Sequence, residues 1–226
     1  MKILSFIFAA ITILMPYVTQ KTGLSKKYGF PLKMLCAFLY LITGAFSAVA
    51  FGSVTEYTLM MLGGLALGML GDFFLEYKAK KLFPLGVVFF ALGHIVYSIT
   101  FLFIGAYKAS SHMTAVLGIT VAVTALIVAF AKTKLKLKGK KNMLLIYVPV
   151  LIFSFACALT KGAVALYEGN AVFGLCLIAG GTLFFASDIM IGVGKGGIKR
   201  PKFLHYAVSY TYFAAQALFA LSILFQ

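Results

Sequence analysis

The sequence predicts an all-α membrane protein, a polytopic bundle of eight transmembrane helices. Of its 226 residues 62% are apolar and only 11% are charged, far fewer charges than a soluble domain of this length carries. The apolar residues form eight runs of about 20 residues, the length needed to cross about 30 Å of hydrocarbon. Lysines fill the short gaps between the runs. We therefore expect a single helical domain over residues 1–226, embedded in the lipid bilayer.

The predicted spans are residues 3–19, 34–52, 57–77, 83–106, 112–131, 142–161, 170–193 and 203–225. Pro31, Pro84 and Pro201 each follow a basic connection, where a helix begins and the missing N–H has no role. Pro16 and Pro149 lie inside the first and sixth spans and predict kinks.

Basic residues alternate between connections. The first, third, fifth and seventh connections hold four, three, six and four Lys or Arg, and the remaining basic residues are Lys2, Lys108 and Lys161. The positive-inside bias predicts a plasma-membrane protein with these four connections in the cytoplasm and both termini outside. The first span resembles a signal peptide in its start, but no Ala-x-Ala site follows, so we expect it to be retained.

A weak four-plus-four repeat is also predicted. The third and seventh spans both run inward, and each carries an aspartate late in the span, followed by an aromatic-rich helix. Internal duplication of this kind is common among membrane bundles.

The chain has two aspartates, Asp72 and Asp188, and both lie inside predicted spans. A charged residue deep in the bilayer costs about 2.5–3.5 kcal/mol even on the lenient insertion scale, so such residues are functional candidates. Asp72 shares a helix face with Gly64, Gly68 and Glu76, which recur every four residues. The glycines predict close helix packing, and Glu76 is either a solvated end charge or a substrate contact.

Other polar residues accompany the aspartates. His94 and Tyr97 share one face of the fourth span, and Ser187 adjoins Asp188. The last span carries a polar stripe that includes His205, Ser209, Tyr212 and Gln216, with Tyr206 and Tyr210 beside it, and shorter stripes are Tyr40-Thr43-Ser47 and Tyr147-Ser154. Because polar faces turn away from lipid, we expect these side chains to line one cavity in the cytoplasmic half of the bundle.

The glycines that follow Asp188, at 192, 194, 196 and 197, have two interpretations. They end a helix, or they cradle a phosphate together with Lys195, Lys199 and Arg200.

Two carboxyl groups in one low-dielectric cavity titrate in separate steps. One then acts as an acid, while the other stabilises a developing cation or activates water. The lipid group that breaks through an oxocarbenium ion is a vinyl ether. An acid-catalysed cleavage of an ether lipid is therefore one chemistry that fits these residues.

The chain resembles the lysoplasmalogenase (YhhN-like) membrane family in five motifs: Gly71-Asp72, Gly86, Gly93-His94 with Tyr97, Gly181-x-Leu183-Phe184-x-x-Ser187-Asp188, and Tyr212-Phe213-Ala214-Ala215-Gln216. The resemblance implies hydrolysis of the vinyl ether bond of lysoplasmalogens to a fatty aldehyde and a glycerophospho-ethanolamine or -choline. It implies that Asp72 and Asp188 are catalytic, in an order that the sequence leaves open.

Further residues would contact the substrate. We expect this of His94, Tyr97, Ser187, Tyr212 and Gln216, and of Glu76 and Tyr210. We expect no cofactor or metal, no nucleic-acid partner despite the net charge of +15, and no obligate protein partner. The expected partners are a lysophospholipid substrate and the bilayer.

Two other functions fit the same residues. Intramembrane carboxylates also relay protons, so a proton-coupled carrier of lipids or small molecules is one alternative. A metal-dependent lipid hydrolase, with zinc held by His94, His205 and an aspartate, is the other, although no HExxH motif is present.

Overall fold

The structure is a computed structural model that describes residues 1–76, 82–134, 141–195 and 202–226. These residues form eight α-helices and no strand, which confirms the all-α class. The helices are α1 (Lys2–Lys21), α2 (Leu24–Phe51), α3 (Glu56–Glu76), α4 (Phe83–Phe103), α5 (Met113–Lys134), α6 (Lys141–Tyr167), α7 (Ala171–Lys195) and α8 (Lys202–Ser222). A short 3₁₀ helix, η2 (Ala109–His112), precedes α5.

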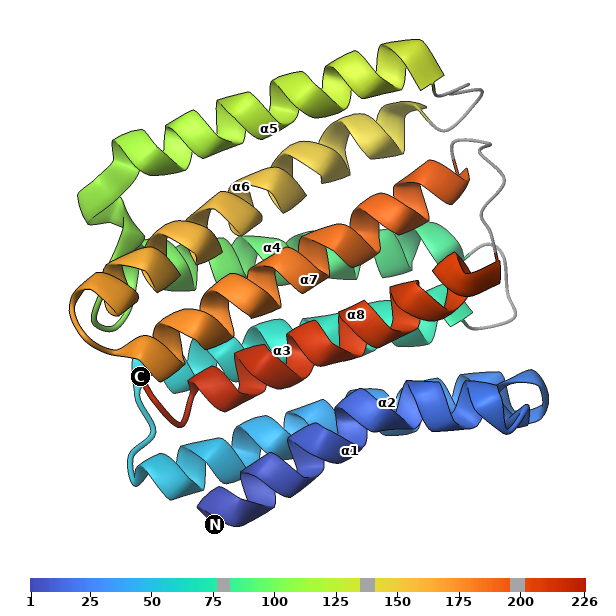
Figure 1. Ribbon diagram of the computed structural model, residues 1–226, viewed down its shortest axis with the longest axis horizontal. Helices are drawn as coiled ribbons and strands as arrows, with labels where there is room; N and C mark the ends of the chain where they lie inside the picture. The colour runs from blue at the N-terminus through green and yellow to red at the C-terminus, as the bar shows by residue number, and fades with distance from the viewer. Residues whose placement is uncertain (77–81, 135–140, 196–201) are drawn as a thin grey trace.

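Seven helices of the described chain are long and apolar enough to cross a membrane, which makes the protein a multi-pass membrane protein. The eighth, α8, lies alongside them (Figure 1) and packs against α1, α2, α3 and α7. Its polar residues lower its hydropathy, yet from Tyr212 to Leu224 nearly every residue is buried. A polar helix is tolerated here because neighbouring helices shield it from lipid.

Six helices form a closed ring in which each packs against the next: α2, α3, α4, α6, α7 and α8. Helix α1 lies outside the ring against α2 and α8, and α5 lies outside it against α6. Both termini are at one end of the bundle, opposite the α1–α2 connection (Figure 1). Helices α3–α4 and α7–α8 form closely packed pairs, while the predicted four-plus-four repeat stays a prediction.

Helix α2 begins ten residues earlier than the predicted start at 34. It starts at Leu24, breaks at Tyr28 (φ −126°, ψ 34°), and resumes with Pro31 near its new beginning. Proline is tolerated there because the first turn of a helix has no acceptor for its N–H. Lys33 consequently lies within the helix and not in a connection, which corrects the charge assignment made from sequence.

The structure also corrects the position expected for Lys161. Helix α6 continues to Tyr167, so Lys161 lies inside it and is fully buried. Its Nζ donates hydrogen bonds to the carbonyl oxygens of Ile104 (2.9 Å) and Ala106 (2.5 Å) and lies 5.6 Å from the centre of the Tyr57 ring. This lysine is therefore not an exterior loop charge, because hydrogen bonds to carbonyl oxygens just beyond the end of α4 hold its ammonium group inside the bundle.

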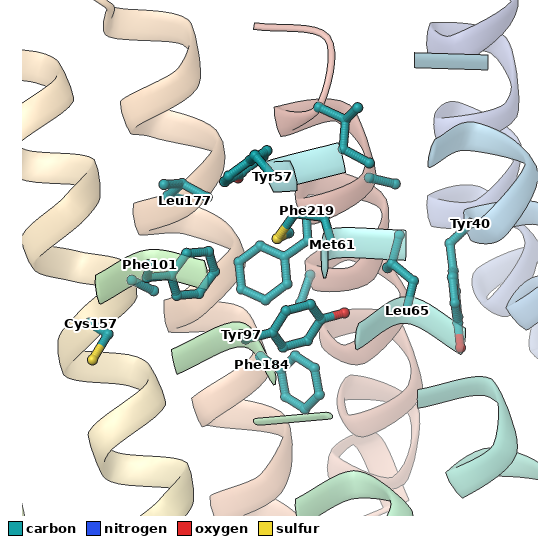
Figure 2. Packing of buried hydrophobic residues seen from close by; sticks show 14 of the residues in the cluster. Tyr40, Tyr57, Met61, Leu65, Tyr97, Phe101, Cys157, Leu177, Phe184 and Phe219 are labelled. Atoms are coloured by element: carbon teal, nitrogen blue, oxygen red, sulfur yellow. The ribbon is translucent and has the colours of Figure 1, made fainter. Parts of the chain in front are cut away.

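Aromatic rings fill the centre of the bundle (Figure 2). Phe219 of α8 lies 5.0 Å from Tyr97 and 5.6 Å from Phe101, both on α4, measured between ring centres. Phe184 of α7 lies 6.3 Å from the same Phe219 ring. Edge-to-face and tilted packing of this kind joins α4, α7 and α8 into one core.

Helices α6 and α7 touch through backbone atoms at two glycines. A Cβ added to Gly162 would lie 2.8 Å from the carbonyl oxygen of Gly174, and a Cβ on Gly174 would lie 2.6 Å from that of Gly162. Backbone atoms cannot move aside as a flexible side chain does. The small residues therefore set the distance between the two helices.

We predict that Gly162→Ala destabilises the bundle by about 1–3 kcal/mol, because the added methyl group overpacks this contact. Thermal unfolding of the purified protein in detergent would measure the loss. Gly118→Ala on α5 is the matched control, since nothing lies within 4 Å of its added Cβ. Equal unfolding temperatures for the two variants would contradict the prediction.

Candidate active site

Asp72 lies near the end of α3 and is only 1% exposed. Lys33 of α2 extends its ammonium group towards it, with Nζ 3.3 Å from Oδ1 of Asp72 and 2.9 Å from Oε1 of Glu76. The Glu76 side chain is 46% exposed, whereas that of Lys33 is 23% exposed. The three charges thus run from the end of the bundle into its interior, and Lys33 compensates the charge of the buried carboxylate.

Gly68 lies one helical turn before Asp72, and polar groups converge on it. A Cβ on Gly68 would lie 2.5 Å from Nε2 of Gln216, 3.3 Å from Oη of Tyr212 and 3.5 Å from Oη of Tyr40. Only a residue without a side chain leaves room for these groups. The packing role predicted for Gly68 is confirmed, and here it admits polar side chains to the level of Asp72.

A chain of hydrogen bonds continues from this point. Tyr97 donates to Oε1 of Gln216 (2.9 Å), and Nε2 of Gln216 donates to Oη of Tyr212 (3.0 Å). Tyr212 lies close enough to Asp72 to interact with its charge. The Asp72 carboxylate is buried and interacts with the Tyr212 hydroxyl group as well as with the Lys33 ammonium group.

Asp188 belongs to a second cluster, built from three helices. Its Oδ2 lies 3.3 Å from Nε2 of His94 on α4 and accepts a short hydrogen bond from the hydroxyl group of Tyr147 on α6. The Tyr147 hydroxyl also lies 3.3 Å from Nε2 of His94. Both His94 and the Asp188 side chain are more than nine-tenths buried. This is a carboxylate, an imidazole and a phenol in mutual hydrogen-bonding distance within the bundle.

Aromatic rings separate the two clusters. The Phe184 ring lies 4.6 Å from the His94 ring and 5.4 Å from the Tyr212 ring, and Phe90 lies 5.7 Å from Tyr212. No contact recorded for the described residues joins Asp72 to Asp188. The prediction that both line one cavity therefore differs from the structure, because the phenyl rings fill the space between them.

Two hollows are found in the described part of the chain. One is a void of about 10 Å³ beside His94, lined also by Ser154, Phe155 and Phe184. The other is a pocket of about 380 Å³ at the end that holds the C-terminus, and its walls include Tyr57, Tyr107 and Phe173. Of these two hollows, the small void touches the cluster of His94 and Asp188.

Several residues predicted for the site have other surroundings. Ser187 donates to the carbonyl oxygen of Val208 (3.1 Å) and so ties α7 to α8. Tyr210 is 42% exposed on the outer side of α8, two residues from the buried Tyr212. The His205 side chain and the glycine-rich stretch beyond Lys195 lie outside the described residues.

The sequence did not reveal the contacts that two residues make with the aspartates. Lys33 was counted as a connection charge, although its place two residues after a helix-starting proline puts it in the first turns of α2. Tyr147 was recognised as polar, but its partner was not. No three His, Cys, Asp or Glu side chains gather among the described residues, but the metal alternative includes His205, whose side chain lies outside them, so it stays untested.

We predict that Lys33→Met costs about 3 kcal/mol of stability, because it leaves the buried Asp72 carboxylate without a compensating charge. The double variant Lys33→Met/Asp72→Asn should recover most of the loss, since no buried charge remains. Thermal unfolding of the four proteins in detergent, as a double-mutant cycle, gives the coupling energy. Additive effects of the two substitutions would contradict the ion pair.

No curated protein and no solved structure matches the chain. One family model matches residues 29–223, from the start of the resumed part of α2 to the end of α8. Both aspartates, and every residue described in the two clusters, lie within the match. The chain belongs to the YhhN family, the lysoplasmalogenase-like family of membrane proteins.

Proposed function

We propose that the protein is a lysoplasmalogenase of the membrane, which hydrolyses the vinyl ether bond of lysoplasmenyl-ethanolamine or -choline. Family membership indicates a lysoplasmalogenase-like, hydrolase-type function. The observation that carries the finer proposal is the pair of buried carboxylates, Asp72 and Asp188, each held by its own charged or hydrogen-bonding partner. Buried carboxylates on transmembrane helices are retained for function rather than for stability.

The surroundings of the two aspartates support different roles. Asp72 faces the Lys33 ammonium group, so it serves as a lasting negative charge that stabilises an oxocarbenium ion. Oδ2 of Asp188 contacts both the imidazole of His94 and the phenol of Tyr147, and both of these groups can exchange protons. The proton that starts the reaction therefore comes from the Asp188 cluster in this proposal.

The reaction balances with water as the only co-reactant. A proton adds to the vinyl carbon farther from the ether oxygen, and the lone pair of that oxygen stabilises the cation on the other carbon. Water adds to this cation and loses one proton. The hemiacetal then breaks its bond to the glycerol oxygen, which yields a fatty aldehyde and a glycerophospho-base.

The route of the substrate follows from the position of the charges. Glu76 and Lys33 lie near the end of α3, close in sequence to the basic connection that we assign to the cytoplasm. A single-chain amphiphile in the inner leaflet would hold its headgroup at this level and its chain among the phenyl rings. We propose that Tyr97, Tyr212 and Gln216 orient the glycerol oxygens, and that the protein resides in the plasma membrane with both termini outside.

The proton-coupled carrier remains the second candidate. The hydrogen-bond chain from Tyr97 through Gln216 to Tyr212 ends beside Asp72, as a proton relay would. A carrier moves its substrate without changing it. Product formation therefore separates the two functions.

We predict that purified protein releases aldehyde from a lysoplasmalogen and none from the saturated ether lipid of equal chain length. Asp72→Asn and Asp188→Asn should each lower turnover by about 100-fold or more. Glu168→Gln, at an exposed position between α6 and α7, is the matched acid-to-amide control and should keep parental turnover.

Two outcomes would count against this proposal. Near-parental turnover of both aspartate variants would remove the two carboxyl groups from the mechanism. No aldehyde from any lysoplasmalogen, together with pH-driven uptake of the intact lipid by vesicles, would favour the carrier.

A further inference from the structure

The contacts of His94 determine which of its ring nitrogens carries the proton. Tyr147 donates its only hydroxyl proton to Oδ2 of Asp188, so that hydroxyl can only accept from His94. Nε2 of His94 faces this hydroxyl and the same carboxylate oxygen, each at 3.3 Å. Without a hydrogen, Nε2 would point its lone pair at the lone pairs of two acceptor oxygens, and these contacts would be repulsive. All three contacts are favourable together only when Nε2 bears the hydrogen.

The other ring nitrogen of His94 is therefore the one that gains and loses a proton. Nδ1 is buried and has no hydrogen-bond partner among the described residues. An unsatisfied buried nitrogen is costly, and it indicates an absent water or ligand. His94 also lines the void of about 10 Å³, which is the volume that one water molecule requires.

The lining of the void is mostly apolar. Apart from His94 and Ser154, its lining is apolar and includes Phe155, Phe184 and Phe185. Phenyl rings accept an alkenyl chain, and their faces stabilise a neighbouring cation. The His94 side chain and an apolar wall thus meet at this void, one ring away from Tyr212 and the Asp72 cluster.

We propose that His94 is a catalytic residue, and that its Nδ1, rather than the Asp188 carboxyl group, transfers the proton in vinyl ether hydrolysis. This inference rests on the proposed function. The protonated ring gives the hydrogen on Nδ1 to the vinyl carbon, and the π electrons of the double bond form the new C–H bond. Water then attacks the oxocarbenium carbon and returns one proton to Nδ1, which restores the imidazolium ring.

In this arrangement Asp188 and Tyr147 are positioning residues. The Asp188 carboxylate holds the hydrogen on Nε2 and stabilises the positive charge of the protonated ring, in the way that a buried aspartate supports a catalytic histidine. Tyr147 fixes the carboxylate oxygen from the opposite helix. The loss of activity predicted for Asp188→Asn then arises through the histidine.

His94→Gln is the decisive variant, because the Gln amide nitrogen can take the place of Nε2 and still donate to Asp188. It replaces the imidazole ring, and so removes the nitrogen that carries the transferred proton while keeping a donor at the position of Nε2. We expect turnover of a lysoplasmalogen to fall about 100-fold or more. His112→Gln, at an exposed position on η2, is the matched control and should keep parental turnover. A smaller loss in His94→Gln would overturn the proposal.

A measurement on the unaltered site covers the case in which His94→Gln does not fold. Nitrogen-15 NMR of histidine-labelled protein reports which ring nitrogen is protonated, and His112→Gln and His205→Gln assign the His94 signal by elimination. We expect hydrogen on Nε2 in the neutral ring and the second proton on Nδ1 upon acidification. A neutral ring with hydrogen on Nδ1 would overturn the proposal.

The two proposals fail in different ways. If the parent protein releases no aldehyde, vinyl ether hydrolysis is wrong, whatever the histidine signal shows. If the parent releases aldehyde and His94→Gln does so at a comparable rate, the proposed hydrolysis is supported and the proposed proton transfer by His94 is wrong.

Discussion

The ion pair between Lys33 and Asp72 is the interaction on which the rest of the site depends. A carboxylate that is 1% exposed requires a compensating charge, and Lys33 provides it from α2. Lys33 lies on the part of α2 that restarts after the break at Tyr28, and from there its ammonium group reaches Asp72 of α3. Gly68, Tyr212 and the hydrogen-bond chain beyond them are arranged around a charge that is already neutralised.

The division of the polar groups into two clusters changes how the chemistry is understood. Carboxyl groups in one cavity would compete for a single proton. Here Asp72 has an ammonium partner, while Asp188 has an imidazole and a phenol, so both carboxylates can be charged at once. In the proposed mechanism, proton transfer and cation stabilisation are tasks of separate clusters, and the exchangeable proton resides on neither aspartate.

The fold could be predicted from sequence because the bilayer dictates both the length and the composition of each helix. The family motifs, including the two aspartates, were also identifiable. Lys33 and Lys161 were misplaced because charge counting treats every lysine as solvated, whereas here tertiary contacts with a carboxylate and with carbonyl oxygens hold them inside. Helical periodicity likewise could not give the distance between Asp72 and Asp188, which depends on how the intervening side chains pack.

Phe184 is the residue that lies between the Asp72 cluster and the Asp188 cluster. Its ring contacts His94 on one side and Tyr212 on the other, and it also packs near Phe219 in the core. The Phe184 side chain is only 3% exposed and is packed among four other aromatic side chains, so it has little room to rotate. The two polar clusters are therefore kept apart by the tight packing of the aromatic core.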